Sequence, residues 1–191
     1  MAREEIVSSA SERLILVDEQ DREIGSELKS VCHEGTGILH RAFSIFVFNS
    51  KDELLLQQRS ASKPLWPGYW SNTCCSHPRL GETMEIAVSR RLEQELGFEC
   101  GLGFLYKFMY QAQFGDAGAE REYCWVYLGY YDGPVDPNVS EIANWRFVDI
   151  KSLEKELETG ADRFTPWFKL EWSHIREHYL DDILARRELA G

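Results

Sequence analysis

Basic residues are in deficit in this sequence of 191 residues, which has 21 Lys and Arg against 32 Asp and Glu and a formal net charge of −11. A protein that grips the phosphates of long nucleic acids needs a surplus of Lys and Arg on at least one face. The deficit therefore argues against a nucleic-acid partner. A small anionic ligand is still compatible with it, because a local basic pocket can work inside an acidic protein.

The chain also lacks a long apolar run. No stretch approaches the roughly 18–20 apolar residues that a membrane-crossing helix needs, and the first dozen residues contain no apolar core of a secretion signal. We therefore predict a soluble, unexported protein with no membrane partner.

Paired cysteine motifs are missing as well. The five cysteines are odd in number and include no C-x-x-C pair, which argues against both a disulfide framework and a thiolate zinc site. Free thiols in a reducing compartment fit better, so we predict a cytoplasmic protein. We interpret Cys32 and Cys100 as structural.

What the chain does contain is enough apolar material for one well-filled core, at 43% hydrophobic and 13% aromatic residues. Branched and aromatic residues predict strands at 14–17, 40–49, 53–59, 69–73, 102–111 and 123–131, with a hairpin loop at residues 49–52. Helical patterns occupy 83–96, closed by Gly97, and 152–158. This order predicts an α+β fold with helices packed on a mostly β core.

The C-terminal part predicts one further helix. It begins at Pro166, which suits the first helical position, and carries an apolar stripe of Phe168, Trp172, Ile175, Tyr179 and Ile183. We therefore divide the chain into a flexible leader (1–12), one domain (13–167) and a C-terminal helix packed on that domain (168–191).

The segment around residue 75 carries the clearest chemical signal. In an extended segment, Cys75 and His77 project to the same side, so a thiol lies beside a candidate metal ligand. Cys74 projects to the other side, and we assign it to packing.

Histidines and glutamates complete a candidate metal site. His33, His40 and His77 are three of only five histidines and lie near strand ends, and Glu120 and Glu122 share one face of a strand about 6–7 Å apart. Imidazole with carboxylate suits Zn²⁺, Mn²⁺ or Fe²⁺. The alternatives are hydrogen-bonded structural histidines and glutamates in solvent.

Charged residues in two further places indicate an anion site. Glu95 lies on the buried stripe of the helix at 83–96 with Arg91 at its edge, either as a carboxylate held for a metal-phosphate group or as an ordinary ion pair. Arg59 and Lys63 are four residues apart, and Lys63 begins a rigid aromatic loop over residues 63–70. Guanidinium plus ammonium suits a diphosphate. The alternative is that both cations are simply solvated.

Together these pieces resemble the type I isopentenyl-diphosphate isomerases, a branch of the Nudix fold. The matching motifs are CHEGTGILHRAF, RSASKPLWPGYWSNTCCSHPRLGE, RRLEQELG, EREYC and TPW, spread over residues 14–167. The resemblance implies a Nudix-type fold with mixed β-sheets flanked by helices and an added C-terminal helix. It also implies a small isoprenoid diphosphate as substrate, and a monomer or weak homodimer.

The Nudix hydrolase box is present only in degraded form. Glu82, Arg90, Leu92, Glu95 and Gly97 fit it, whereas Ser76, Arg91 and Gln94 replace the first glycine and two acidic positions. The carboxylates that gather Mg²⁺ for hydrolysis are reduced to Glu95, which favours the isomerase over a hydrolase.

The resemblance assigns roles by position. It implies a divalent ion (zinc, manganese or magnesium) on His33, His40, His77, Glu120 and Glu122, and a second ion, Mg²⁺, bound with the diphosphate at Glu95. Contacts to the diphosphate fall on Lys29, Arg59, Lys63, Ser76 and Arg91. Cys75 and Glu122, with Tyr110 alongside, would handle protons on opposite faces of the substrate, and Trp167 would face the cation.

The implied reaction converts isopentenyl diphosphate to dimethylallyl diphosphate by a 1,3-allylic proton shift through a tertiary cation. Trp70 is a further candidate for the cavity wall, while Trp125 and Trp145 are interpreted as core. Two rival functions are a Nudix diphosphate hydrolase and a non-catalytic, metal-stabilised binding module.

Overall fold

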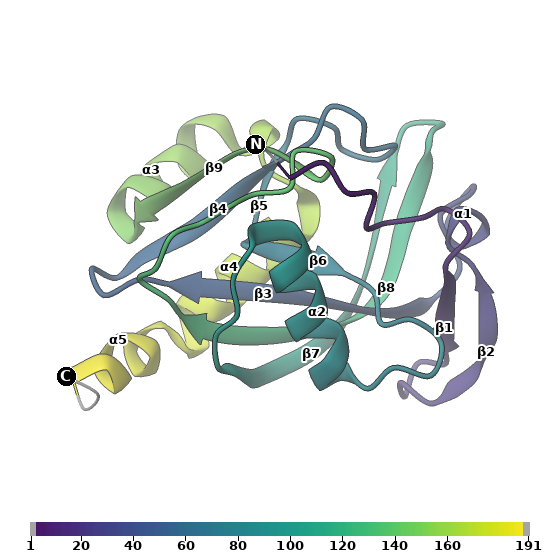
Figure 1. Cartoon of the computed structure of the whole chain (residues 1–191), viewed down its shortest axis with the longest axis horizontal. Helices are drawn as coiled ribbons and strands as arrows, with labels where there is room; N and C mark the ends of the chain where they lie inside the picture. The colour runs from purple at the N-terminus through teal and green to yellow at the C-terminus, as the bar shows by residue number, and fades with distance from the viewer. Residues whose placement is uncertain (1–2, 189–191) are drawn as a thin grey trace.

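The computed structural model describes residues 3–188, whose strands form one nine-stranded mixed sheet flanked by helices on both faces (Figure 1). The strands are β1 (Arg13–Val17), β2 (Glu23–Leu28), β3 (His40–Phe48), β4 (Glu53–Arg59), β5 (Trp70–Ser71), β6 (Cys74–Ser76), β7 (Leu102–Phe114), β8 (Gly118–Tyr130) and β9 (Ile142–Asp149). The helices are α1 (Lys29–Cys32), α2 (Met84–Leu96), α3 (Ile150–Gly160), the 3-10 turn η1 (Ala161–Arg163), α4 (Pro166–His178) and α5 (Leu180–Glu188).

Strand β3 lies at the centre of this sheet. It pairs in parallel with β8 from His40 opposite Glu122 to Phe48 opposite Tyr130, and antiparallel with β6, where Ser44 lies opposite Cys75. Side chains alternate between the two faces of a strand. The register therefore places His40, Ser44, Cys75 and Glu122 on one and the same face.

A helix covers each face of β3. In Figure 1, α2 lies in front of β3 and α4 behind it. The α2 side buries Ile45 and Cys74, while the α4 side buries Phe46 and has Cys75 packed against it. The adjacent thiols therefore point into different cores, as the extended segment predicts.

Two local sequence signals correspond to observed elements. Helix α2 starts after Thr83, whose side chain accepts a hydrogen bond from the Ile86 amide, and ends at Gly97 in the left-handed region (φ 75°). The hairpin loop lies where residues 49–52 predict it, since Asn49 Oδ1 accepts from the amides of Lys51 and Glu53.

The single C-terminal helix that we predicted is wrong: two helices, α4 and α5, meet at Tyr179. Tyr179 leaves the helical conformation (φ −130°, ψ −19°), and its ring stacks on Tyr106 of β7 at 5.5 Å. Neither Gly nor Pro marks the break in the sequence. A contact between distant parts of the chain accompanies it instead. The apolar stripe nevertheless packs inward, with Phe168 and Ile183 buried.

Several strands differ from the sequence prediction. The predicted strand at 69–73 is reduced to β5, with β6 following separately, and β7 and β8 extend further toward their common turn than predicted. Strands β2 and β9 were not predicted. Strand β2 is polar and half exposed, and in β9 the exposed and partly buried positions do not alternate, so neither has the period-two pattern of a half-buried strand.

The segment before β1 runs across the top of the molecule in Figure 1 on its way to β1. Arg3 pairs with Glu93, Asn138 donates to the Glu5 carbonyl, and the Val7 carbonyl accepts from Arg91. Ile6, Ser8 and Ala10 of this segment form part of the wall of a cavity described below. We predicted residues 1–12 as a flexible leader, of which 1–2 lie outside the described residues.

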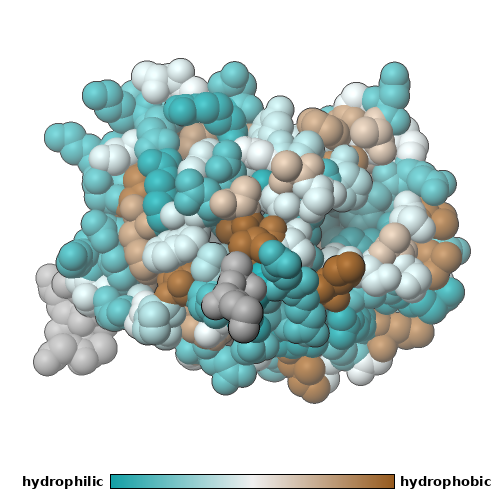
Figure 2. All heavy atoms as spheres, turned by 45° about the horizontal axis from the view of Figure 1, so that its top comes forward, coloured by the Kyte–Doolittle hydropathy of each residue, from teal (hydrophilic) through white to brown (hydrophobic). Residues whose placement is uncertain are grey.

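No helix within residues 3–188 has the length and apolar character needed to span a membrane. The face in Figure 2 is largely hydrophilic, with hydrophobic side chains in small separate groups.

Candidate active site

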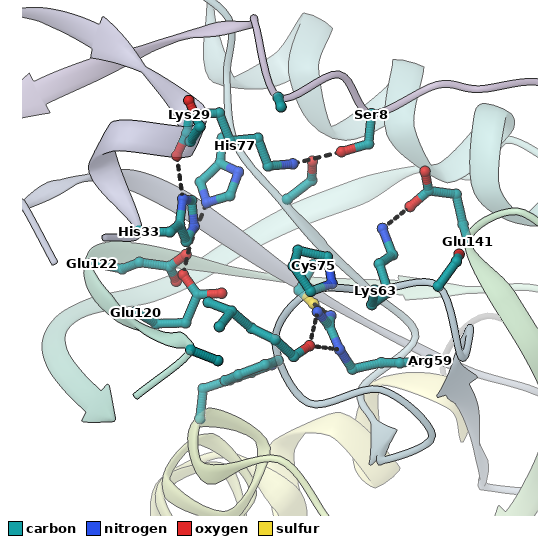
Figure 3. Close-up of a pocket in the computed structure, with 18 of the residues that line it drawn as sticks. Ser8, Lys29, His33, Arg59, Lys63, Cys75, His77, Glu120, Glu122 and Glu141 are labelled. Atoms are coloured by element: carbon teal, nitrogen blue, oxygen red, sulfur yellow. Dashed lines mark hydrogen bonds and ion pairs between the residues drawn. The ribbon is translucent and has the colours of Figure 1, made fainter. Parts of the chain in front are cut away.

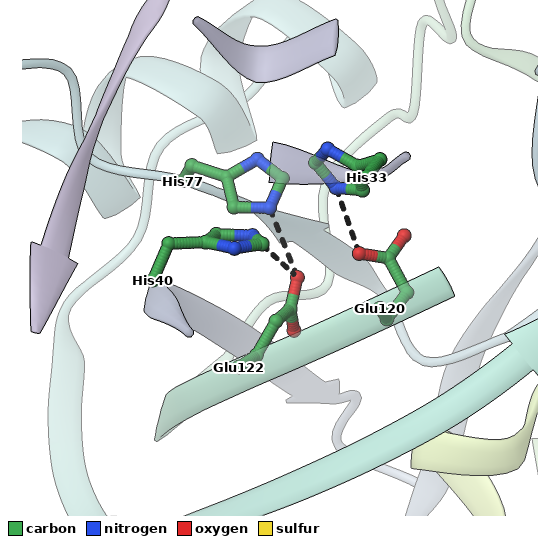
Figure 4. A group of neighbouring side chains, drawn as sticks. All are labelled: His33, His40, His77, Glu120 and Glu122. Atoms are coloured by element: carbon green, nitrogen blue, oxygen red, sulfur yellow. Dashed lines mark hydrogen bonds and ion pairs between the residues drawn. The ribbon is translucent and has the colours of Figure 1, made fainter. Parts of the chain in front are cut away.

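Three histidines and two glutamates converge at one end of the central strands (Figure 4). His33 caps α1, His40 opens β3, His77 follows β6, and Glu120 and Glu122 rise from β8. Their ligand atoms all lie within 4.8 Å of one another. This is the set that the sequence proposed, and it could hold a metal ion.

Hydrogen bonds orient two of these imidazoles. His33 Nδ1 lies 2.7 Å from the Lys29 carbonyl, and His40 Nδ1 lies 2.7 Å from the Ile38 carbonyl. Because a carbonyl only accepts, each Nδ1 carries a proton, so Nε2 is the ring nitrogen that would offer its lone pair to a metal at the centre of the cluster.

The cluster fits a metal ion by two further criteria. His40 Nε2 is buried and has no hydrogen-bond partner among the described residues, an orphaned lone pair that a cation would satisfy. Burial and the nearby His40 and Lys29 hold the pKa of His77 well below its usual value. Burial opposes ionisation of Glu122, but the nearby His40 imidazole and the hydrogen bond from Tyr110 hold its pKa below the usual value. Neutral imidazole and ionised carboxylate are the metal-binding forms.

A cavity of about 540 Å³ opens beside the cluster. Cys75 lies in its wall between the metal cluster and Arg59, as Figure 3 shows, and Glu122 and Tyr110 line the same space. The Tyr110 hydroxyl donates to Glu122 Oε2 at 2.6 Å. The proposed thiol and the proposed metal-bound carboxylate therefore face a shared cavity.

The Cys75 sulfur is held as a thiol. Burial raises the pKa of Cys75 to about 12, opposed by Arg59, whose Nη1 lies 3.9 Å from Sγ. A protonated thiol is the form that gives a proton away.

The predicted diphosphate contacts also line this cavity: Lys29, Arg59, Lys63, Ser76 and Arg91. Burial, together with repulsion from Lys63 and Arg91, lowers the pKa of Lys29 to about 8. Trp167 is a wall residue too, and the Arg59 guanidinium lies 5.3 Å from the centre of its ring.

Two predicted residues are placed elsewhere. Glu95 is not among the described residues that line the cavity, and one of its carboxylate oxygens is paired with Arg91. Trp70, which we expected in the cavity wall, instead stacks with Arg146, whose guanidinium lies 4.7 Å from the centre of the indole ring. Trp70 is not among the described residues that line the cavity.

Comparisons with known proteins identify relatives of this chain. The sequence matches the NUDIX domain family over residues 38–168. It is 43% identical over 174 residues to isopentenyl-diphosphate Delta-isomerase 1 of Photorhabdus laumondii, covering 90% of this chain and 99% of that relative. It is 46% identical over 157 residues to isopentenyl-diphosphate Delta-isomerase of Burkholderia multivorans, covering 82% and 89%. This chain belongs to the isopentenyl-diphosphate Delta-isomerase family.

Solved structures confirm the Nudix-type fold of this family member. A Deinococcus radiodurans protein aligns with a TM-score of 0.65 at 23% identity, covering 78% of this chain and 90% of that chain. The MutT protein of Methanosarcina mazei Go1 aligns with a TM-score of 0.61 at 19% identity, covering 74% and 96%. Both the predicted family and the predicted α+β architecture are therefore confirmed.

Sequence reasoning missed two buried carboxylates of this isomerase-family chain. Glu141 lines the cavity between Lys63 and Arg91, and its partners are distant in sequence, so no local motif marks it. Glu171 lies on α4, one turn after Trp167, and was hidden in a stripe interpreted as core packing.

Glu171 has an unusual environment. It is fully buried, its Oε1 accepts from Cys124 Sγ at 3.4 Å, and its Oε2 has no partner among the described residues. Burial raises the pKa of Glu171 to about 8, only partly offset by hydrogen bonds from Ser44 and Cys124. Its carboxyl group is therefore mostly protonated at neutral pH.

We expect Glu171→Gln to flatten the pH dependence of stability. Because the folded-state pKa exceeds the ordinary value of 4.5, the unfolded chain loses this proton first, and stability falls as pH rises from about 4.5 to about 8. The neutral amide escapes this loss, so the variant should gain on the order of a few kcal/mol over the parent at pH 8.5 and little at pH 5.

Thermal unfolding of both proteins at pH 5 and pH 8.5 measures the difference. Glu177→Gln is the matched control, since its side chain is 71% exposed on the same helix. A constant offset between Glu171→Gln and the parent at the two pH values would contradict the buried, protonated carboxyl.

Proposed function

We propose that this chain interconverts isopentenyl diphosphate and dimethylallyl diphosphate by adding a proton on one face of the substrate and removing one on the other. The observation that carries the proposal is the shared cavity of Cys75 and Glu122 beside a His₃Glu₂ cluster. Relatives that bear the isomerase name cover most of this chain and support it.

Two proton steps follow from the residues. The Cys75 thiol gives its proton to the terminal alkene carbon, and the electron pair of the double bond forms the new C–H bond, leaving a tertiary cation at the neighbouring carbon. Glu122 then takes a proton from the adjacent methylene, and the released electron pair forms the new double bond. Tyr110 holds Glu122 in place through its hydroxyl.

A divalent ion on the cluster would supply positive charge that keeps Glu122 ionised and oriented. His33, His40, His77 and Glu120 would be its other ligands. The donor set accepts Zn²⁺, Mn²⁺ or Mg²⁺, and the availability of these ions decides which one is bound.

The tertiary carbocation intermediate needs a cavity wall that excludes water and offers an electron-rich face. Trp167 is 3% exposed, and its ring borders the cavity. An aromatic face over a desolvated cation contributes about 2 kcal/mol, and it offers no nucleophile to trap the intermediate.

The diphosphate end would be held by cations on the opposite wall. We propose Lys29, Arg59, Lys63 and Arg91 as its contacts with Ser76 as a hydroxyl donor, and the substrate as a Mg²⁺ complex associated with Glu95. A Nudix hydrolase remains the rival enzyme, but Ser76 replaces the first glycine of its box, and Arg91 and Gln94 replace two of its acidic residues.

One assay tests the function. The purified protein is incubated with isopentenyl diphosphate and Mg²⁺ in D₂O, and label uptake, allylic product and released phosphate are followed together. Isomerisation predicts deuterium in the product and no phosphate. Phosphate release without allylic product would establish the hydrolase. If neither allylic product nor phosphate forms, the result favours the metal-stabilised binding module.

The remaining predictions concern the domain bounds, the oligomeric state, the partners and the location of the protein. We propose one domain at 13–167 that works as a monomer or weak homodimer on a small diphosphate, without nucleic-acid or membrane partners. A cytoplasmic location is supported by the five free cysteines, which suit a reducing compartment.

A further inference from the structure

Glu141 occupies a position in the cavity that the mechanism above does not use. It lies in the turn just before β9, is 4% exposed and forms part of the cavity wall. Its Oε2 is paired with the ammonium of Lys63 and lies 3.3 Å from Nη2 of Arg91. Figure 3 shows Lys63 turned toward this carboxylate. A cation that should bind phosphate is therefore already paired.

The carboxylate is ionised in this setting. Burial disfavours its charge, but Lys63 and Arg91 together hold the pKa of Glu141 below the usual value. Arg91 is shared between several groups. Its Nη2, which lies near Glu141, also pairs with Glu95, and its Nη1 donates to the Val7 carbonyl. Lys63 is thus the main counter-ion of Glu141.

Binding of a diphosphate changes this balance. If Lys63 turns to a phosphate oxygen, Glu141 keeps only the shared contact with Arg91 while facing a multiply charged anion across the cavity. A buried carboxylate that loses its counter-ion is strongly unfavourable. A divalent cation that arrives with the diphosphate removes this cost, since Mg²⁺ prefers carboxylate and phosphate oxygens as ligands.

We propose that Glu141 couples diphosphate binding to Mg²⁺: it competes with the bare diphosphate for Lys63 and pairs with the Mg²⁺ of the Mg²⁺–diphosphate complex. This rests on the proposed function, because it takes the diphosphate to bind at Lys63. Glu141 supplies the carboxylate on the cavity side, whereas Glu95 pairs with the same Arg91 and is not among the described residues that line the cavity. Glu141 therefore determines whether the site binds the bare diphosphate or its Mg²⁺ complex.

Titration calorimetry with inorganic diphosphate, with and without Mg²⁺, tests the coupling. The cluster of three histidines and two glutamates is loaded with one metal beforehand, and its content is measured after each titration. In the parent protein, Mg²⁺ should tighten diphosphate binding about tenfold or more. In Glu141→Gln, Mg²⁺-free diphosphate should bind about tenfold tighter than in the parent, and the effect of Mg²⁺ should fall below about threefold.

Two variants serve as controls. Glu141→Asp keeps the charge and should keep most of the Mg²⁺ dependence. Glu12→Gln removes a different carboxylate near the cavity, one that raises the pKa of Lys29 but pairs with Arg79, so it should leave the Mg²⁺ dependence as in the parent. Lys63→Gln provides a test if Glu141→Gln does not fold: it should weaken Mg²⁺-free binding and retain the Mg²⁺ enhancement.

The results that overturn the proposal are distinct from a failure of the function. Equal weakening of both affinities in Glu141→Gln, or no change in either, would overturn it, as would loss of the Mg²⁺ enhancement in Lys63→Gln. A parent protein that binds Mg²⁺–diphosphate but shows no label uptake in D₂O would sink the isomerase proposal alone. A parent protein that binds no diphosphate at all would sink both.

Discussion

Replacing Cys75 by alanine is expected to lower kcat about a thousandfold or more while leaving the fold intact. The burial that raises the pKa of Cys75 to about 12 keeps the sulfur protonated, and no second thiol borders the cavity among the described residues. Alanine keeps the Cβ and removes only the acid. The measurement is steady-state turnover of isopentenyl diphosphate, with label uptake in D₂O as the more sensitive readout.

The neighbouring cysteine gives a matched control for this experiment. Cys74 has the same chemistry and differs by one position, but it is fully buried in the core against α2. Cys74→Ala should therefore lower the unfolding temperature and leave kcat within a fewfold of the parent. Near-parental turnover in Cys75→Ala, or equal losses in both variants, would contradict the proton-donor role.

Glu122→Gln is expected to have the largest effect, a loss of about ten-thousandfold in kcat together with weaker metal binding. Glu122 Oε1 lies 2.9 Å from His77 Nε2 and 3.7 Å from His40 Nε2, while Oε2 accepts from Tyr110 at 2.6 Å. The amide retains the shape but is a poor metal ligand and cannot accept the substrate proton. Metal content by elemental analysis and turnover are measured on the same samples.

Glu120→Gln separates these two roles. Glu120 pairs with His33 at 2.8 Å and belongs to the same metal set, but it is not proposed to handle a proton. At saturating metal its activity should recover far more than that of Glu122→Gln. Similar residual activity in the two variants at full metal occupancy would refute a proton role for Glu122.

Much of the candidate metal cluster, and the cavity thiol, could be named from the sequence because the signals of Cys75, His77, Glu120 and Glu122 are local. Cys75 and His77 are two residues apart at the end of β6, and Glu120 and Glu122 are two residues apart on β8, so the alternation of side chains in an extended chain already places each pair on one face. The family resemblance then joined these pairs.

Glu141 and Glu171 could not be found this way. The contact between Glu141 and Lys63 crosses 78 positions of the chain, and that between Glu171 and Cys124 crosses 47. The break at Tyr179 likewise coincides with a ring contact to Tyr106 in a distant strand. Contacts of this kind arise only when the sheet and α4 have come together, and composition within a short window carries no trace of them.

The parallel register of β3 and β8 limits how this family can change in length. Deleting one residue from residues 40–48 or 122–130 would turn every later side chain of that strand to the opposite face, exchanging core and cavity residues together. Insertions and deletions should therefore accumulate in turns such as residues 49–52 and be purged from these two strands. Single side chains of these two strands can be substituted during evolution, but the lengths of the strands cannot change.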